Sequence, residues 1–274
     1  MTVKQIKRKI PTLIMLLISV IYLVPIWLIL VNSFKSVSEA NLLGIGLPEN
    51  FKLHYENYII VFQEGGIVRA FFNGVLEAAC SSLIIILFSS LAAFIIGRRQ
   101  NRITNIVYYI FICGLIIPPA FVPTYMSLRL MNLLDTYTGL ILIFTAYGLP
   151  ISIFLYTGFL KTISRQLDES AFLEGCSPIR IFYQIIFPLL TPVTTTIFIF
   201  CFVGAWNDVM IPMFFVNGDK WALPLTLYKF KGTYGTRWNL VFADIVITIL
   251  PLFTLFVFAQ RYMIDGLTAG AVKG

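Results

Sequence analysis

Long apolar stretches alternate with short polar segments along the chain, and this alternation predicts its architecture. The apolar stretches lie at residues 11–31, 71–97, 106–128, 139–159, 192–215 and 240–259. Each reaches or exceeds the roughly 20 residues that a helix needs to cross the hydrocarbon core of a bilayer. The pattern therefore predicts an all-α integral membrane protein with about six transmembrane helices.

The composition excludes an ordinary soluble protein. Hydrophobic residues make up 58% of the 274 residues and charged residues only 12%, whereas soluble chains are roughly a quarter charged. The formal net charge of +7 raises the alternative of a nucleic-acid partner. The basic residues lie between the apolar stretches, however, where they set membrane orientation, so we expect no nucleic acid.

The positions of Lys and Arg predict which segments face the cytoplasm. The residues on the predicted inner side are Lys4, Lys7, Arg8, Lys9, Arg98, Arg99, Arg102, Lys161, Arg165, Arg180, Arg261 and Lys273. Segments 32–70 and 217–238 then form external loops, of which the second also carries basic residues. The predicted inner side still carries more Lys and Arg residues than the predicted external loops, so both termini are predicted to be cytoplasmic. No small-residue cleavage site follows the first stretch, which we interpret as an uncleaved span.

Prolines at positions 118, 119 and 123 interrupt the third span, and Pro150 interrupts the fourth. A proline frees a backbone carbonyl, and such a break survives in a membrane only where neighbouring helices or a water-filled cavity satisfy the freed group. We therefore expect the third span to be broken and to lie inside the helix bundle.

Polar side chains inside the spans leave two interpretations open. Asn73 and Glu77 lie near the end of the second span, where we favour solvated or snorkelling groups over a pathway role. Trp206, Asn207 and Asp208 lie in the fifth span. For Asp208 a structural role, at an interface or at a helix break near Pro212, is favoured over a place in the pathway or gate.

A polar segment at residues 164–188 separates the fourth and fifth spans and predicts a helix, a turn and a second helix. Asp168 and Glu169 lie near the start of the first helix, where negative charge meets the positive end of the helix dipole. Gly175 ends that helix, because glycine accepts the left-handed conformation that commonly closes one. Ser177 followed by Pro178 starts the second helix, which prolines 188 and 192 end or kink.

This segment resembles the coupling (EAA) motif of the membrane subunits of ABC importers. The residues that carry the resemblance are Glu169, Ser170, Ala171, Glu174, Gly175, Phe182, Ile185 and Pro188. Ser170 and Cys176 stand where the family usually has Ala, and Glu174 where it usually has Asp. The resemblance implies a contact with an ATPase subunit, to which Glu169 contributes charge, Gly175 the turn, and Phe182 with the neighbouring isoleucines apolar burial in a groove.

The C-terminal residues resemble one branch of that family, the maltose-permease G-type subunits of carbohydrate importers. The likeness rests on Gln260-Arg261-Tyr262, on Gly266-Leu267-Thr268 with the small-residue ending of the chain, and on Trp206-Asn207-Asp208. It implies that the tail, through Gly266, Thr268, Gly270 and Lys273, enters the ATPase interface. Without the resemblance, a glycine-rich end of this kind is typical of a frayed terminus.

The resemblance implies a permease subunit in a bacterial or archaeal cell membrane that imports a sugar or oligosaccharide by alternating access. Its partners are a second homologous permease, two ATPase subunits and an external sugar-binding protein. The chain has no Gly-x-x-x-x-Gly-Lys-Ser/Thr loop, so ATP and Mg belong to the partners and no cofactor is expected here. The whole chain is then one domain, with an N-tail at 1–10, a bundle at 11–260 and a C-tail at 261–274.

Other functions remain open. A non-sugar solute is possible, because the coupling motif is shared between branches. A secondary transporter would need its own buried carboxylates, and only Asp208, with Glu77 and Asp244 near span ends, is offered. A membrane-embedded enzyme or a metal site is disfavoured, because His54 is the sole histidine and the four cysteines are widely spaced.

Overall fold

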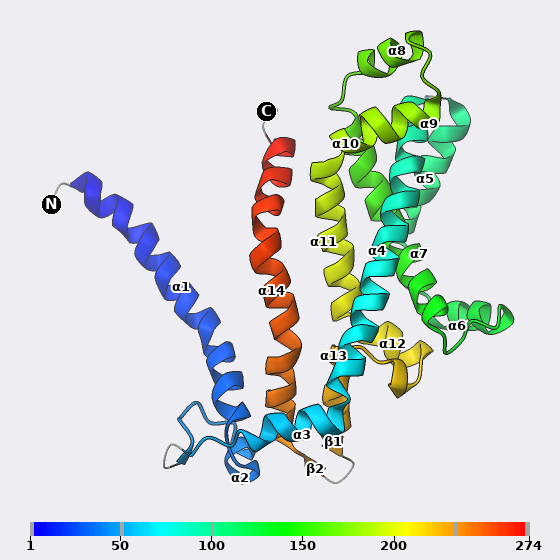
Figure 1. Cartoon of the computed structure of the whole chain (residues 1–274). Helices are drawn as coiled ribbons and strands as arrows, with labels where there is room; N and C mark the ends of the chain where they lie inside the picture. Colours follow the sequence, from blue (N-terminus) through cyan, green and yellow to red (C-terminus); the bar gives the residue numbers. More distant parts are fainter. Residues whose placement is uncertain (1–2, 50–51, 100, 233–234, 272–274) are drawn as a thin grey trace. The chain divides into compact units, whose positions relative to one another are not determined.

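A computed structural model describes the backbone of residues 3–49, 52–99, 101–232 and 235–271, and within these ranges the side chains of residues 11–12 and 15–257. The chain is helical almost throughout (Figure 1). The one β element among the described residues is a hairpin in which β1 (Lys231–Gly232) runs antiparallel to β2 (Gly235–Thr236) and Lys231 pairs with Thr236.

Four helices in the described part of the chain contain segments long and apolar enough to cross a membrane. The helices are α1 (Val3–Ser33), α4 (Ile67–Arg98), α7 (Tyr137–Leu160) and α14 (Trp238–Ala271). Two bent helix pairs raise the number of candidate spans to as many as six. The prediction of a multi-span helical protein is thereby confirmed, with the expected break present in the third span and a second bend just before the predicted fifth span.

The first bent pair follows from the predicted proline break. Helix α5 (Arg102–Ile116) and helix α6 (Phe121–Leu130) meet at 118°. The amide of Ile117 donates the last helical hydrogen bond, to the Cys113 carbonyl at 3.3 Å. Pro118 and Pro119 come next and have no N–H to continue the helix, so the chain turns.

The chain forms two compact units, which are described separately. The first comprises residues 1–69 and 223–251. It contains α1, α2 (Val37–Asn41), α3 (Glu56–Gly65), α13 (Leu223–Thr226), the 3-10 turn η4 (Leu227–Phe230), the hairpin and the first part of α14. Segments 32–70 and 217–238, predicted as loops, thus hold short helices and a hairpin.

Local capping explains why α2 forms. Ser36 accepts a hydrogen bond from the Glu39 amide, and the Glu39 carboxylate accepts one from the Ser36 amide at 2.9 Å, which makes a capping box. The Ser36 hydroxyl, which donates to the Glu39 carboxylate at 2.6 Å, is the main cause that lowers the pKa of Glu39 to about 2, and the Glu49 and Ser36 amides add to it. A short helix therefore replaces the expected loop.

Asn57 joins three helices of the first unit. Its amide nitrogen donates to the carbonyls of Ser33 and Lys35, each at 2.9 Å, and its oxygen accepts from the Asn239 amide at 2.7 Å. Asn57 and Asn239 are both 4% exposed. The end of α1, the start of α3 and the start of α14 therefore meet at one buried side chain.

The second unit comprises residues 70–222 and 252–274. It contains most of α4, α5 to α7, α8 (Gln166–Leu173), α9 (Pro178–Ile181), the π-helical turn η2 (Phe182–Ile186), α10 (Phe187–Leu189), α11 (Thr191–Asn207), α12 (Met210–Phe215) and the 3-10 turn η3 (Gly218–Lys220). Helices α8 and α9 lie at one end of this unit, and α6 and α12 lie at the other (Figure 1).

The core of the second unit lies between α4, α7 and α11. Its buried members include Ile85, Ala93, Tyr156, Leu160, Ile186, Leu190, Val193 and Ile197. Gly148 permits the close approach of α7 to α4, because a Cβ atom there would overlap the Ile85 side chain. The Tyr156 hydroxyl donates to Thr194 at 2.8 Å, so α7 and α11 are also joined by a polar contact.

Asn57→Leu should destabilise the protein, because it leaves two carbonyls and the Asn239 amide without their partner. Each unpaired buried group costs about 1–3 kcal/mol, so we expect a clearly lower midpoint of thermal unfolding in detergent. Gln63→Leu is the matched control, because Gln63 lies exposed on the same helix α3. Equal unfolding midpoints for the two variants would contradict the central role of Asn57.

Candidate functional site

The predicted helix, turn and helix are present at residues 166–181, at one end of the second unit. Helix α8 carries Asp168 and Glu169 in its first turn. Gly175 has a φ of 82°, its amide donates to the Phe172 carbonyl at 3.0 Å, and the Cys176 amide donates to Ala171 at 3.0 Å. These two bonds form a Schellman motif, for which the left-handed glycine is the usual residue.

The second helix differs from the prediction. Ser177 accepts from the Arg180 amide at 3.4 Å and Pro178 opens α9, as expected. After Ile181 the chain winds into the π-helical turn η2, in which the Phe187 amide donates to the Phe182 carbonyl. Pro188 has no N–H for the next helical bond, and the chain then bends by 76° into α11. The single helix expected after Ser177 is therefore three short segments, α9, η2 and α10, followed by a bend.

An ion pair fixes α8 to the end of α4. Arg98 Nε lies 2.5 Å from Asp168 Oδ2, and these side chains are 12% and 18% exposed. Arg98 also donates to the Ile163 carbonyl at 3.3 Å, and Arg165 donates to the Gly97 carbonyl at 3.2 Å. Burial raises the pKa of the Asp168 carboxyl, and the Arg98 guanidinium opposes that rise. Sequence reasoning used Arg98 only as an orientation signal and missed this pair.

The structure divides the predicted contact residues into a buried and an exposed set. Ala171 and Phe182 are 6% and 2% exposed and pack inside the unit, where the rings of Phe182 and Phe94 are 5.3 Å apart. Ile185 is half-buried, and the exposed members are Glu169, Ser170, Glu174, Gly175 and Pro188. The idea that Phe182 enters a partner's groove is therefore corrected, because its ring is already buried within this chain.

Exposed apolar side chains missed by the sequence reasoning surround the turn. Phe172, Leu173 and Ile179 are 67%, 87% and 72% exposed. Together with Leu91, Phe94 and Ile95 of α4, they line a groove of about 690 Å³ whose rim includes Asp168 and Glu169. Periodicity could have found these residues, since Phe172 and Leu173 stand on the face of α8 away from the buried Ala171. An exposed apolar patch of this kind is typical of a protein contact.

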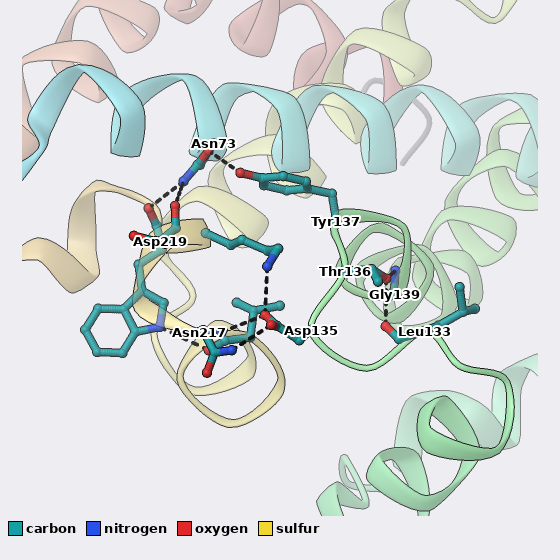
Figure 2. Close-up of polar contacts among 11 residues, drawn as sticks. Asn73, Leu133, Asp135, Thr136, Tyr137, Gly139, Asn217 and Asp219 are labelled. Carbon is teal, nitrogen blue, oxygen red and sulfur yellow. Dashed lines mark hydrogen bonds and ion pairs between the residues drawn. The ribbon is translucent and has the colours of Figure 1, made fainter.

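Asn73 is buried at the other end of the unit and holds two connecting segments in place. Its amide nitrogen donates to the carbonyls of Asp219 and Trp221 at 3.0 and 3.1 Å, and its oxygen accepts from the Tyr137 hydroxyl at 2.8 Å (Figure 2). Asn73 is 6% exposed and Glu77 is 1% exposed. The interpretation of both as solvated groups is therefore wrong.

Asp135 extends this network to the residues that come after α12. Its carboxylate accepts from the Asn217 amide at 2.9 Å, from the Asn217 side chain at 2.6 Å and from Lys220 Nζ at 3.0 Å (Figure 2). The first of these bonds is the main cause of the lowered pKa of Asp135. The turn before α7 and segment 217–221 are therefore held together by polar contacts.

The residues proposed for the pathway or gate lie at a helix break. Asp208 ends α11, and its carboxylate accepts from the Ile211 amide at 2.7 Å at the start of α12. Asn207 is exposed, whereas Trp206 is 1% exposed and its ring lies 5.9 Å from that of Phe71. The break lies at Asp208 instead of near Pro212. Asp208 also lines a cavity of about 200 Å³ between α4, α7 and α11.

Two further carboxylates are buried within spans. Asp244 of the first unit is fully buried and accepts from the Thr226 hydroxyl at 2.9 Å. The Glu77 carboxylate of the second unit has no hydrogen-bond partner among the described residues.

The predicted contacts of the C-terminal tail fall largely outside the described side chains. Helix α14 continues through Gly266, Thr268 and Gly270, but only the backbone is described there, and Lys273 lies outside the described residues.

A family model described as binding-protein-dependent transport system inner membrane component matches residues 85–268, which include the helix, turn and helix. The chain belongs to this family. The family prediction made from the polar segment and the C-terminal residues is therefore confirmed.

Named relatives of this permease cover nearly its whole length. It is 34% identical over 273 residues to a probable starch degradation products transport system permease, AmyC of Thermoanaerobacterium thermosulfurigenes, with 98% of each chain covered. It is 33% identical to the melibiose/raffinose/stachyose import permease MelC of Bacillus subtilis, with 97% of each chain covered.

The fold of the permease is that of a solved importer subunit. A chain of a bacterial ABC transporter involved in the import of the acidic polysaccharide alginate aligns with a TM-score of 0.80 at 20% identity, over 94% of this chain and 96% of that chain. At this identity the likeness concerns the fold alone.

Asp168→Asn should loosen α8, because Arg98 loses its counter-charge in a largely buried position. We expect the amides of residues 166–173 to exchange with deuterium about tenfold faster, as local opening becomes easier. Glu174→Gln is the matched control, since Glu174 is an exposed acid directly after the last residue of α8. Unchanged exchange in Asp168→Asn would show that the ion pair does not hold the helix.

Proposed function

We propose that this permease is the membrane subunit of an ATP-driven importer that moves a sugar or oligosaccharide across the cell membrane by alternating access. The supporting observation is the 34% identity to a permease named for starch degradation products, spread over 98% of both chains. The permease named for melibiose, raffinose and stachyose is similar to the same extent. Likeness over the full length favours a shared substrate class over a shared fold alone.

The proposed assembly needs partners for energy and for delivery. The chain has no phosphate-binding Gly-x-x-x-x-Gly-Lys-Ser/Thr loop, so two ATPase subunits supply the energy. A second homologous permease completes the path, and an external binding protein delivers the solute. Under this proposal the basic residues at the ends of the spans place both termini and α8 in the cytoplasm, in a bacterial or archaeal cell membrane, with the whole chain acting as one transmembrane domain of six spans.

We place the ATPase contact at the turn around Gly175. Phe172, Leu173 and Ile179 offer exposed apolar surface on both sides of this turn, and Glu169 offers a charge at the rim. Apolar side chains surrounded by polar ones are typical of contact centres between proteins. Ala171 and Phe182 support this contact indirectly, because their buried side chains pack α8 and η2 against the rest of the unit. The C-terminal residues, including Lys273, contribute a second contact to the ATPase.

At the external side, segment 217–238 faces the binding protein in this proposal. It contains η3, α13 and the hairpin, and its start is held by Asn73 and Asp135. The anchored start of the segment, residues 217–221, can present a fixed surface to a docking protein at a low cost in entropy.

Reconstituting the permease with its partner subunits and a sugar-binding protein tests the function. We expect uptake of at least one oligosaccharide that stops when ATP is removed and persists when ion gradients are collapsed. ATPase activity should rise on adding the liganded binding protein. Uptake that follows an ion gradient would support a secondary transporter. Stimulation only by an amino acid, a polyamine or phosphate would overturn the sugar assignment.

Gly175→Val should uncouple ATP hydrolysis from transport. A β-branched residue at a φ of 82° is strained by about 1–2 kcal/mol, while a Cβ atom added there would meet nothing within 4 Å. The assembly should therefore form and hydrolyse ATP, with uptake at least tenfold lower. Gly46→Val is the control, because Gly46 is equally open and its φ is not positive. Normal uptake by Gly175→Val would contradict the proposed role of the turn.

A further inference from the structure

A second cavity in the second unit lies where the ends of α4 and α7 meet the first turns of α5. Its volume is about 620 Å³. Arg98, Lys161 and Arg165 line it together with Tyr108, Tyr109 and Thr157, and none of the described residues that line it is acidic. The groove at α8 is a different space, although Arg98 borders both.

The cavity has a surplus of positive charge. Arg98 is paired with Asp168, which does not line this cavity, and Arg165 donates to the neutral Gly97 carbonyl. Lys161 is exposed and has no ion-pair partner among the described residues. Arg165 is also attracted by Asp168, so one carboxylate faces two guanidinium groups and the Lys161 ammonium, and a net positive charge is left to attract an anion.

A buried hydroxyl in the wall also lacks a partner. Thr157 is 5% exposed, and its Oγ1 atom makes no hydrogen bond to any described residue. Buried polar atoms are nearly always satisfied, so this unpaired hydroxyl beside the cavity is free to donate to a group that the cavity receives. A hydroxyl and two cations together suit an anion with several acceptor oxygens, such as a phosphate.

The depth of the cavity favours a lipid over a free anion. Ile96 and Leu160 line it and belong to the last turns of the apolar segments of α4 and α7, so the cavity lies at the level of the headgroups. Tyr109 is 65% exposed, and tyrosine is enriched at this level. The α5 face that continues from it is apolar, with Ile106 and Ile110 exposed. An acyl chain can lie along that face while the headgroup enters the cavity.

We propose that this cavity binds the headgroup of an anionic phospholipid, with Lys161 and Arg165 contacting the phosphate oxygens and Thr157 donating a hydrogen bond. Basic pockets between transmembrane helices are suited to such headgroups. Under the proposed orientation the lipid belongs to the cytoplasmic leaflet, and it would connect α4, α5 and α7 beside the attachment of α8.

Lipid retention by the purified importer complex tests the proposal. The complex is reconstituted in nanodiscs that contain equal amounts of dioleoyl phosphatidylglycerol and dioleoyl phosphatidylcholine, re-extracted, and its bound lipids are counted by native mass spectrometry. We expect wild-type protein to retain phosphatidylglycerol preferentially. Lys161→Gln should bind it about fivefold more weakly, the factor that one lysine contributes near an anionic headgroup.

Two further variants make the outcome decisive. Lys231→Gln is the control, because Lys231 is an exposed lysine of β1 in the other unit, and it should retain lipid like the wild type. Thr157→Val keeps the shape of the side chain and should also weaken retention. If Lys161→Gln unfolds early, the Thr157→Val result decides the matter.

Equal retention of the two lipids by the wild type, or equal phosphatidylglycerol binding by wild type and Thr157→Val, would overturn the proposal. So would binding of inorganic phosphate to the delipidated complex that phosphatidylglycerol does not displace, because the cavity would then take a free anion.

Discussion

The backbone amide that proline lacks is the constraint on which the rest of this structure depends. In a bilayer, helices survive because each N–H and C=O is paired within the helix. Prolines 118 and 119 remove that pairing between α5 and α6, and Pro188 and Pro192 remove it between α9 and α11. The chain bends by 118° at the first site and by 76° at the second. The elements that meet the solvent at each end of the second unit therefore come from interrupted spans.

Polar side chains form hydrogen bonds with backbone groups that these interruptions leave unpaired. The Asp208 carboxylate accepts a hydrogen bond from the Ile211 amide in the first turn of α12. The Asn73 side-chain amide donates to the carbonyls of Asp219 in η3 and of Trp221 just beyond it. In the first unit Asn57 does the same for the carbonyls at the end of α1. The hydrogen-bond partners of these three side chains lie where helical pairing stops, so Asp208, Asn73 and Asn57 mark breaks in the helices.

The sequence could predict what depends on local chemistry. Hydropathy located the spans, and the order Gly175, Ser177, Pro178 predicted the turn between α8 and α9, because capping acts over a few residues. The spacing from Glu169 to Pro188 also identified the family. The burial of Asn73 was not predictable in this way, because its acceptors lie 146 and 148 residues further along the chain.

The division between buried and exposed aromatic residues around the turn was missed for a different reason. Phe172 and Phe182 are the same residue type, but Phe172 is 67% exposed and Phe182 is 2% exposed. Burial at Ile181, Phe182 and Ile186 follows helical spacing, but spacing alone does not say whether that face packs against its own chain or against a partner. Phe182 is buried because it packs against Phe94 of α4, and a contact between residues so far apart in the sequence leaves no local signal.

The attachment of α8 and α9 explains how a contact at the turn could move the spans. Helix α8 is tied to the end of α4 by the Arg98 and Asp168 ion pair, and η2 is anchored by Phe182 against Phe94 of the same helix. From η2 the chain continues through α10 and a bend into α11. Under the proposed mechanism, a force on Phe172, Leu173 and Ile179 therefore reaches α4 through side chains and α11 through the backbone. The close packing of α4 and α11 in one core then makes these helices respond together, since packed interiors shift between discrete arrangements instead of deforming continuously.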